Sequence, residues 1–109
     1  MGIYSPGRPR KFDPFTGTGR KPPSSPGEYR IRDASGSIAY IGETNSINRR
    51  MREHMHTGKL QPDCTLEYKL ADGRSSSRTR RAHEQAKIAQ HSPTLNRSIG
   101  GEGRIAKRR

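Results

Sequence analysis

The chain has 109 residues and a formal net charge of +12, while only 27% of its residues are hydrophobic. This length and composition allow one small domain at most and exclude a large buried core. No apolar run approaches the roughly 20 residues that a membrane-spanning helix needs. The positive surplus favours a polyanionic partner, with nucleic acid first, acidic protein second and an anionic membrane third.

The first 26 residues differ in composition from the rest of the chain. They contain six of the eight prolines and five basic residues, without apolar periodicity. A segment of this kind buries too little apolar surface to order itself. We therefore expect residues 1–26 to form a flexible, disordered leader that is basic and rich in proline and glycine.

The next stretch predicts a β-hairpin. Residues 28–32 alternate polar and β-prone side chains, and residues 38–41 are a compact β-prone run. The residues at 33–37 are turn formers. Tyr29 and Tyr40 therefore lie on neighbouring strands of one hairpin.

Residues 46–56 predict a helix that ends at Gly58. Its apolar residues recur at helical spacing on one face, namely Ile47, Met51 and Met55. At about 100° per residue, Arg50 and His54 lie together along one edge of this face.

A third strand is predicted at 64–70, where alternate residues share one face: Cys64, Leu66, Tyr68 and Leu70. Cys64 is the single cysteine, so this chain forms no internal disulfide and no cysteine-rich zinc site. We expect Cys64 to be a small apolar residue of the strand.

Serines at 75–77 provide caps for a second helix that runs to about residue 90. Its apolar side is thin, and we expect small residues to pack on the sheet, namely Ala82, Ala86, Ile88 and Ala89. Glu84 lies at the edge of this face. Pro93 breaks the chain after the helix, and Asn96 follows.

Six residues occur in a characteristic order along these elements: Tyr29, Tyr40, Arg50, His54, Glu84 and Asn96. Two triplets, Gly27-Glu28-Tyr29 and Tyr40-Ile41-Gly42, have ten residues between their tyrosines. This pattern resembles the GIY-YIG nuclease family, from residue 27 to about residue 103. Gly2-Ile3-Tyr4 also looks like the first triplet, but no second triplet follows it at the needed distance.

The resemblance implies an α/β fold with a small three-stranded, mostly antiparallel sheet flanked by helices. It implies a GIY-YIG domain at 27–103, between the leader at 1–26 and a basic tail at 104–109.

The resemblance also implies phosphodiester hydrolysis with one hard divalent cation, Mg²⁺ or Mn²⁺, bound by Glu84. Arg50 is expected to stabilise the charge that develops on the phosphate. Tyr29 is favoured as the general base and Tyr40 as the group that positions water or phosphate, although the two roles can be exchanged.

The remaining two positions are expected to support these groups. His54 matches a position that is histidine or tyrosine in relatives, and we expect it to orient a tyrosine or relay its proton. Asn96 is expected to order the site through hydrogen bonds.

Two residues depart from the family pattern. Glu28 stands where an apolar residue is usual, and we expect its side chain to point outward. Glu43 stands where several relatives carry a lysine just after the second triplet, which removes a candidate for polarising the nucleophile.

The function expected from these features is a metal-dependent DNA endonuclease of low sequence selectivity. Further phosphate contacts are expected from four basic residues, namely Arg30, Arg49, Arg52 and Arg97. The leading context is the toxin domain of a bacterial antagonism system with an acidic immunity protein as partner. The alternatives are a mobile-element or repair nuclease and a non-catalytic basic nucleic-acid-binding protein. RNA cleavage and the oligomeric state stay open.

The N-terminus carries no apolar segment after its basic residues, so it does not predict a secretory signal. We expect the chain to act without a membrane, in the cytoplasm of the cell where it cleaves nucleic acid. Delivery from another cell as part of a larger protein is compatible with this expectation.

Overall fold

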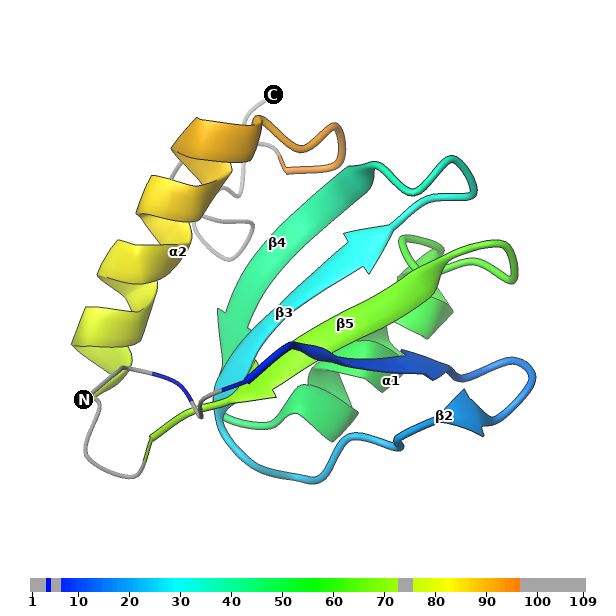
Figure 1. Ribbon diagram of the computed structural model, residues 1–109, viewed down its shortest axis with the longest axis horizontal. Coiled ribbons are helices and arrows are strands. Elements are labelled where there is room, and N and C mark those ends of the chain that lie inside the picture. Colours follow the sequence, from blue (N-terminus) through cyan, green and yellow to red (C-terminus); the bar gives the residue numbers. More distant parts are fainter. Residues whose placement is uncertain (1–3, 5–6, 73–75, 97–109) are drawn as a thin grey trace.

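The structure is a computed structural model that describes residues 4, 7–72 and 76–96 (Figure 1). Its elements, in chain order, are β1 (Arg10–Asp13), β2 (Thr18–Gly19), β3 (Gly27–Arg32), β4 (Ile38–Thr44), α1 (Ile47–Thr57), β5 (Thr65–Leu70) and α2 (Ser77–His91). The α/β class is confirmed, as are the hairpin, both helices and the third predicted strand. Neither helix in the described part of the chain is long and apolar enough to cross a membrane.

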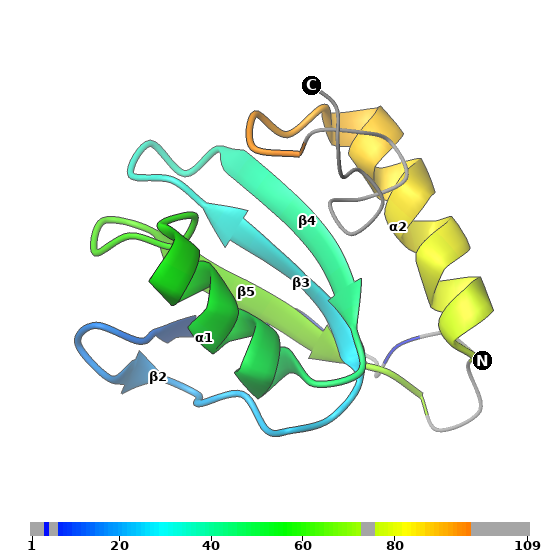
Figure 2. The same cartoon turned by 180° about the vertical axis from the view of Figure 1, so that it is seen from behind.

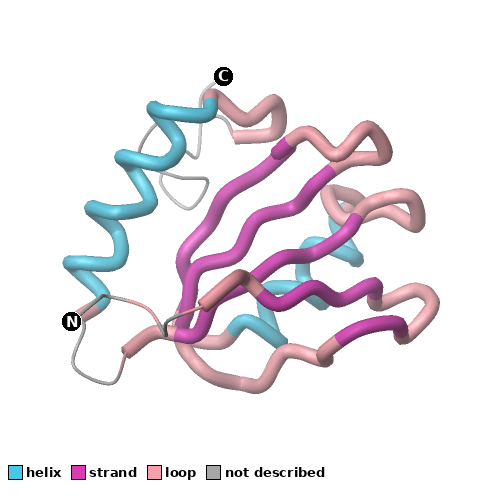
Figure 3. The backbone as a smooth tube through the Cα atoms, viewed as in Figure 1, coloured by secondary structure: helices cyan, strands magenta, loops and turns pink. Residues whose placement is uncertain are grey.

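The sheet has five strands in the order β2-β1-β5-β3-β4, and every pairing is antiparallel. The hairpin strands β3 and β4 therefore occupy one end of the sheet, with β3 between β5 and β4. Helix α1 covers one face of the sheet, whereas α2 runs along β4 (Figures 1 and 2). The tube in Figure 3 shows the same arrangement, with one helix beside the edge of the sheet and the other behind the sheet.

The leader is where the structure differs most from expectation. Residues 10–13 and 18–19 form β1 and β2, so these residues are not a disordered segment and the sheet has five strands instead of three. Strand β1 pairs with β5, and the Tyr68 hydroxyl donates a hydrogen bond to the Arg20 carbonyl at 2.7 Å. Periodicity missed β1 because Phe12 is its single apolar residue, and the strand is recognised by its pairing with β2 and β5.

The core lies between α1 and the sheet. Alternate strand residues, the apolar stripe of α1 and two residues of the loop before β5 meet there: Phe12, Tyr29, Ile31, Tyr40, Ile47, Met51, Leu60, Cys64, Leu66 and Tyr68. Cys64 is buried as expected, but it precedes β5 by one residue and is not part of the strand. Met55 and Leu70 pack against this cluster, as their spacing predicts. The helix begins at the Ser46 cap, whose side chain accepts a hydrogen bond from the Arg49 N–H, and it ends at Gly58 with φ of 87°.

Helix α2 turns a different face to the sheet than its alanines predict. Ala82, Ala86 and Ala89 are exposed, and the buried residues are Arg80, Glu84 and Ile88. These three recur every four residues and therefore form one stripe. The prediction failed because β3 and β4 present carboxylates and backbone groups to this helix, and polar side chains satisfy them better than alanine does.

We predict that Phe12→Ala lowers the free energy of unfolding by about 3 kcal/mol, because it opens a cavity under β1. Phe12 is 8% exposed, whereas Phe15 in the following turn is 42% exposed. Phe15→Ala is therefore the matched control and should change stability by less than about 0.5 kcal/mol. Urea unfolding of the three proteins measures both values. Equal stability of the two variants would contradict a structural role for β1.

Candidate active site

The register of the hairpin places Tyr29 directly beside a glycine. Tyr29 pairs with Gly42, and Tyr40 pairs with Ile31 on the same face. A Cβ atom at position 42 would collide with the ring and hydroxyl of Tyr29. Gly42 is therefore needed for steric reasons, because only a glycine lets the Tyr29 side chain cross β4.

Tyr29, Tyr40 and His54 form one buried group between α1 and the hairpin. The Tyr29 hydroxyl lies 2.7 Å from His54 Nε2, within hydrogen-bond distance. The Tyr29 and Tyr40 rings stack at 5.9 Å between centroids, and the Tyr40 and His54 rings meet edge to face at 4.7 Å. Each of the three side chains is 2% exposed or less. The sequence predicted the residues of this group but not their degree of burial.

Burial controls the charge of this group. It lowers the pKa of His54 to about 3, with smaller effects in the same direction from Arg50 and Lys59. Burial also raises the pKa of Tyr29 well above its ordinary value, and Tyr40 raises it further while Arg50 opposes the rise. Both partners of the Tyr29–His54 hydrogen bond are therefore uncharged near pH 7.

Arg50 brings a positive charge to the edge of this group. It lies one helical turn before His54, as predicted, and its side chain is 28% exposed. Its Nη1 atom donates to Glu53 Oε1 at 2.6 Å. Lys59 adds a second cation, with Nζ 5.8 Å from the centroid of the Tyr40 ring.

Glu84 and Asn96 bind the outer edge of β4. Glu84 is 7% exposed, and its Oε2 atom accepts a hydrogen bond from the Glu43 N–H at 3.1 Å. The Asn96 amide accepts from the Ile41 N–H at 2.9 Å and donates to the Ile41 carbonyl at 3.0 Å. Asn96 therefore completes the edge of the sheet as a neighbouring strand would.

Strand β4 joins the two halves of the candidate site. Tyr40 and Gly42 lie on its α1 side, and Ile41 and Glu43 receive Asn96 and Glu84 at its edge. Figure 2 shows β4 with α1 on one side and α2 on the other. In the described part of the chain, no three His, Cys, Asp or Glu residues come together to hold a metal ion. A hard cation at Glu84 would therefore take most of its ligands from water or substrate.

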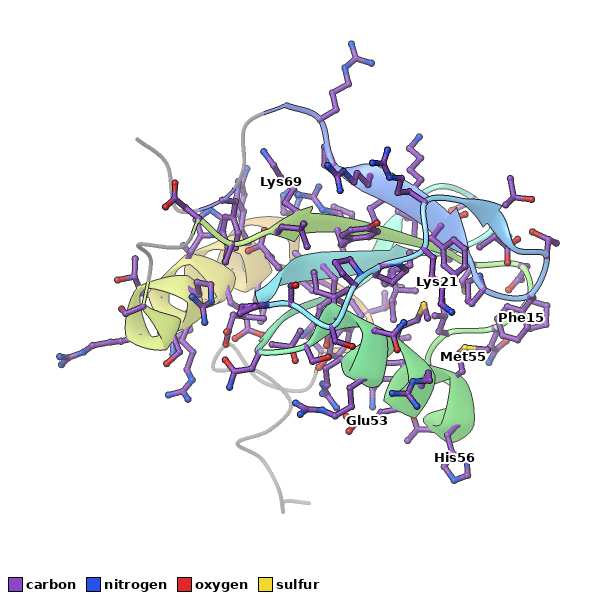
Figure 4. All side chains as sticks on the ribbon, turned by 90° about the horizontal axis from the view of Figure 1, so that it is seen from below. Phe15, Lys21, Glu53, Met55, His56 and Lys69 are labelled. Atoms are coloured by element: carbon purple, nitrogen blue, oxygen red, sulfur yellow. The ribbon has the colours of Figure 1, made fainter. Side chains whose placement is uncertain are left out.

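The arginines predicted to bind phosphate do not form a single patch. Arg49 and Arg52 lie on the outer side of α1, where Arg49 pairs with Glu53 and Arg52 bonds to Asn48. Arg30 is paired with Ile41 and Glu67, on the face opposite to Tyr29. Arg97 lies outside the described residues, as does the tail predicted at 104–109. Figure 4 shows the two faces of the sheet, with Glu53 and His56 of α1 on one face and Lys69 toward the other.

Sequence reasoning missed the environment of the two atypical glutamates. The expectation that Glu28 points outward is wrong, because it is 6% exposed and its Oε2 atom lies 2.7 Å from His83 Nδ1. Glu43 pairs with Arg80 at 3.2 Å. The alternation of residues along the hairpin could have indicated that the two glutamates share an environment, since it places both on the face opposite to the tyrosines.

We predict that His54 makes stability fall as the pH decreases. Its ordinary pKa is 6.5 and its folded pKa is about 3, so the unfolded chain binds more protons between these values. The stabilisation is complete above pH 6.5, and about 2 kcal/mol of it is lost between pH 7 and pH 5. Urea unfolding at both pH values should show this loss in the wild type and not in His54→Gln.

The control for this measurement is His56→Gln, which alters an exposed histidine on the same helix. It should retain the wild-type pH dependence. An identical pH dependence in wild type and His54→Gln would contradict the burial of a neutral imidazole at this position.

Comparison with known proteins agrees with this geometry. The family model described as the GIY-YIG catalytic domain matches residues 25–94. UvrABC system protein C of Solibacter usitatus is 29% identical over 83 residues, and the match covers 68% of this chain and 13% of that protein. The chain thus spans a small part of the length of that relative. The match to more than half of its residues means that this chain belongs to the GIY-YIG catalytic domain family, whose members are nucleases.

Proposed function

We propose that this chain is a metal-dependent endonuclease that hydrolyses DNA phosphodiester bonds with low sequence selectivity. The observation that carries the proposal is the arrangement around β4. The buried Tyr29–His54 pair and Arg50 lie on the α1 side of the hairpin, and the buried carboxylate of Glu84 binds the edge of β4. Membership of a family of catalytic domains supports the same reading.

Glu84 is the proposed ligand of one Mg²⁺ or Mn²⁺ ion. Its carboxylate is a hard oxygen donor, and its hydrogen bond from the Glu43 N–H holds it in one orientation. When bound, such an ion activates water and neutralises charge on the phosphate. Arg50 is proposed to stabilise the negative charge that develops on a phosphate oxygen.

Tyr29 is proposed to accept the proton of the attacking water. Because Tyr29 is itself protonated near pH 7, its own proton must leave at the same time. His54 Nε2 lies 2.7 Å away and is proposed to relay that proton, because burial lowers the pKa of this imidazole to about 3 and disfavours its holding the charge. Tyr40 packs against both rings and would position the water or the phosphate.

A non-catalytic nucleic-acid-binding protein is the competing function. It explains the net charge of +12 equally well, because phosphate contacts dominate such affinity and make it salt-dependent. It does not explain Glu84, since a buried carboxylate near a bound phosphate repels it unless a cation intervenes.

We predict that Glu84→Gln lowers the rate of plasmid nicking in Mg²⁺ by at least about 100-fold, because the amide cannot bind a hard cation as a carboxylate does. The matched control is Asp63→Asn, which removes an exposed carboxylate in the loop between α1 and β5. Chelation of the metal should abolish nicking by the wild type and by this control. Undiminished cleavage by Glu84→Gln would contradict the assignment, and binding without cleavage by the wild type would favour the competing function.

We further propose that the chain acts as the toxin domain of a bacterial antagonism system and is inhibited by an acidic immunity protein. The net charge of +12 supports a partner of opposite charge. A repair role is the alternative that the match to UvrABC system protein C favours.

We predict that expression of the wild-type chain stops bacterial growth, whereas Glu84→Gln does not. Growth curves after induction measure this difference. A co-expressed acidic protein that binds the chain should restore growth and abolish cleavage by the purified chain. Unharmed cells that contain active wild-type nuclease would contradict the toxin role.

A further inference from the structure

Two buried glutamates face each other across the hairpin. Glu28 on β3 pairs with Glu43 on β4, so both side chains lie on the face opposite to Tyr29. Their side chains are 7% and 8% exposed. Like charges directly opposite in a sheet destabilise it, and buried carboxylates need partners. Each glutamate therefore requires a compensating group from outside the hairpin.

Helix α2 supplies a partner for each glutamate. His83 Nδ1 lies 2.7 Å from Glu28 Oε2, and Arg80 Nε lies 3.2 Å from Glu43 Oε2. Arg80 also donates to Asn45 Oδ1 at 3.4 Å. Arg80 is itself buried, at 5% exposure. The contact between α2 and the hairpin at this end of the helix is therefore polar, with one Arg80–Glu43 ion pair and one His83–Glu28 hydrogen bond.

These partners stand beside the proposed metal ligand. Arg80 lies one helical turn before Glu84, and His83 is its direct neighbour. Glu43 receives Arg80 at its carboxylate, while its N–H donates to Glu84. Within α2, Ile88 is the one buried apolar residue. Apolar packing alone would tolerate small shifts along β4, whereas the Arg80–Glu43 ion pair and the His83–Glu28 hydrogen bond favour one position of the helix.

We propose that Arg80 and His83 are positioning residues that set Glu84 on the edge of β4 through their pairs with Glu43 and Glu28. Glu28 and Glu43, the two residues that depart from the family pattern, thus act together to hold α2 in place. The importance of these contacts for catalysis rests on the proposed function, in which Glu84 binds the metal. The positioning itself is independent of metal and can be measured without it.

The test measures how well the hydrogen bond to Glu84 protects the backbone amide at position 43 from exchange with solvent. Hydrogen exchange of that amide is measured by NMR in the metal-free wild type, Arg80→Glu, Glu43→Arg and the charge-swapped double variant. Exchange should be at least about 10-fold faster in each single variant and return to within about threefold of wild type in the double variant. Amides in the middle of β3 should stay protected in all four proteins.

The matched control is Arg81→Glu, which makes the same charge change at the next position, where the side chain is exposed. It should leave the amide at position 43 protected. Equal exchange in Arg80→Glu and Arg81→Glu, or no recovery in the double variant, would overturn the proposal. If Arg80→Glu does not fold, Glu43→Gln provides the test, because it removes the charge that Arg80 binds while keeping the side-chain shape.

Titration calorimetry with Mn²⁺ alone separates this proposal from the proposed function. Arg80→Glu should bind Mn²⁺ at least about 10-fold more weakly than Arg81→Glu, and the double variant should recover. A wild type that neither binds Mn²⁺ nor cleaves DNA would refute the proposed function. The exchange of the amide at position 43 would still decide whether Arg80 positions Glu84.

Discussion

The pairing register of β3 and β4 is the constraint on which the rest of the structure depends. It places Tyr29 beside Gly42 on one face of the hairpin and Glu28 beside Glu43 on the other. A slip by one residue would turn every side chain of one strand to the opposite face. One tyrosine would then lose its contact with α1, and one glutamate would lose its partner on α2. The register therefore determines both the chemistry on one side and the helix docking on the other.

Burial determines the charge of the group on the α1 side. The protein surrounds Tyr29 and His54 with core residues, which disfavours charge on either side chain and keeps both neutral. Arg50 remains partly exposed beside them and carries the positive charge. The Tyr29–His54 hydrogen bond, at 2.7 Å, is the direct path by which the proposed mechanism would pass a proton from the tyrosine.

On the opposite side of the hairpin, polar contacts hold the helix in place of apolar packing. There the helix docks through charged and backbone groups, and its alanines face solvent. A buried ion pair is costly to break, because the remaining partner stays buried without compensation. This cost favours a single position of α2 more strongly than the packing of small apolar side chains does. Fixing the helix also fixes the place of Glu84, since Glu84 lies on the same buried stripe as Arg80.

Local alternation and helical spacing in the sequence determined the hairpin, both helices and the strand predicted at 64–70 and observed at 65–70. The family resemblance of the sequence identified Tyr29, Tyr40 and His54 as members of one site. Tertiary structure decided the place of β1, whose single apolar residue Phe12 leaves no periodic signal. It also decided which side chains bind Glu28 and Glu43. Their partners in α2 lie 37 and 55 residues away along the chain, and no local pattern specifies contacts at that separation.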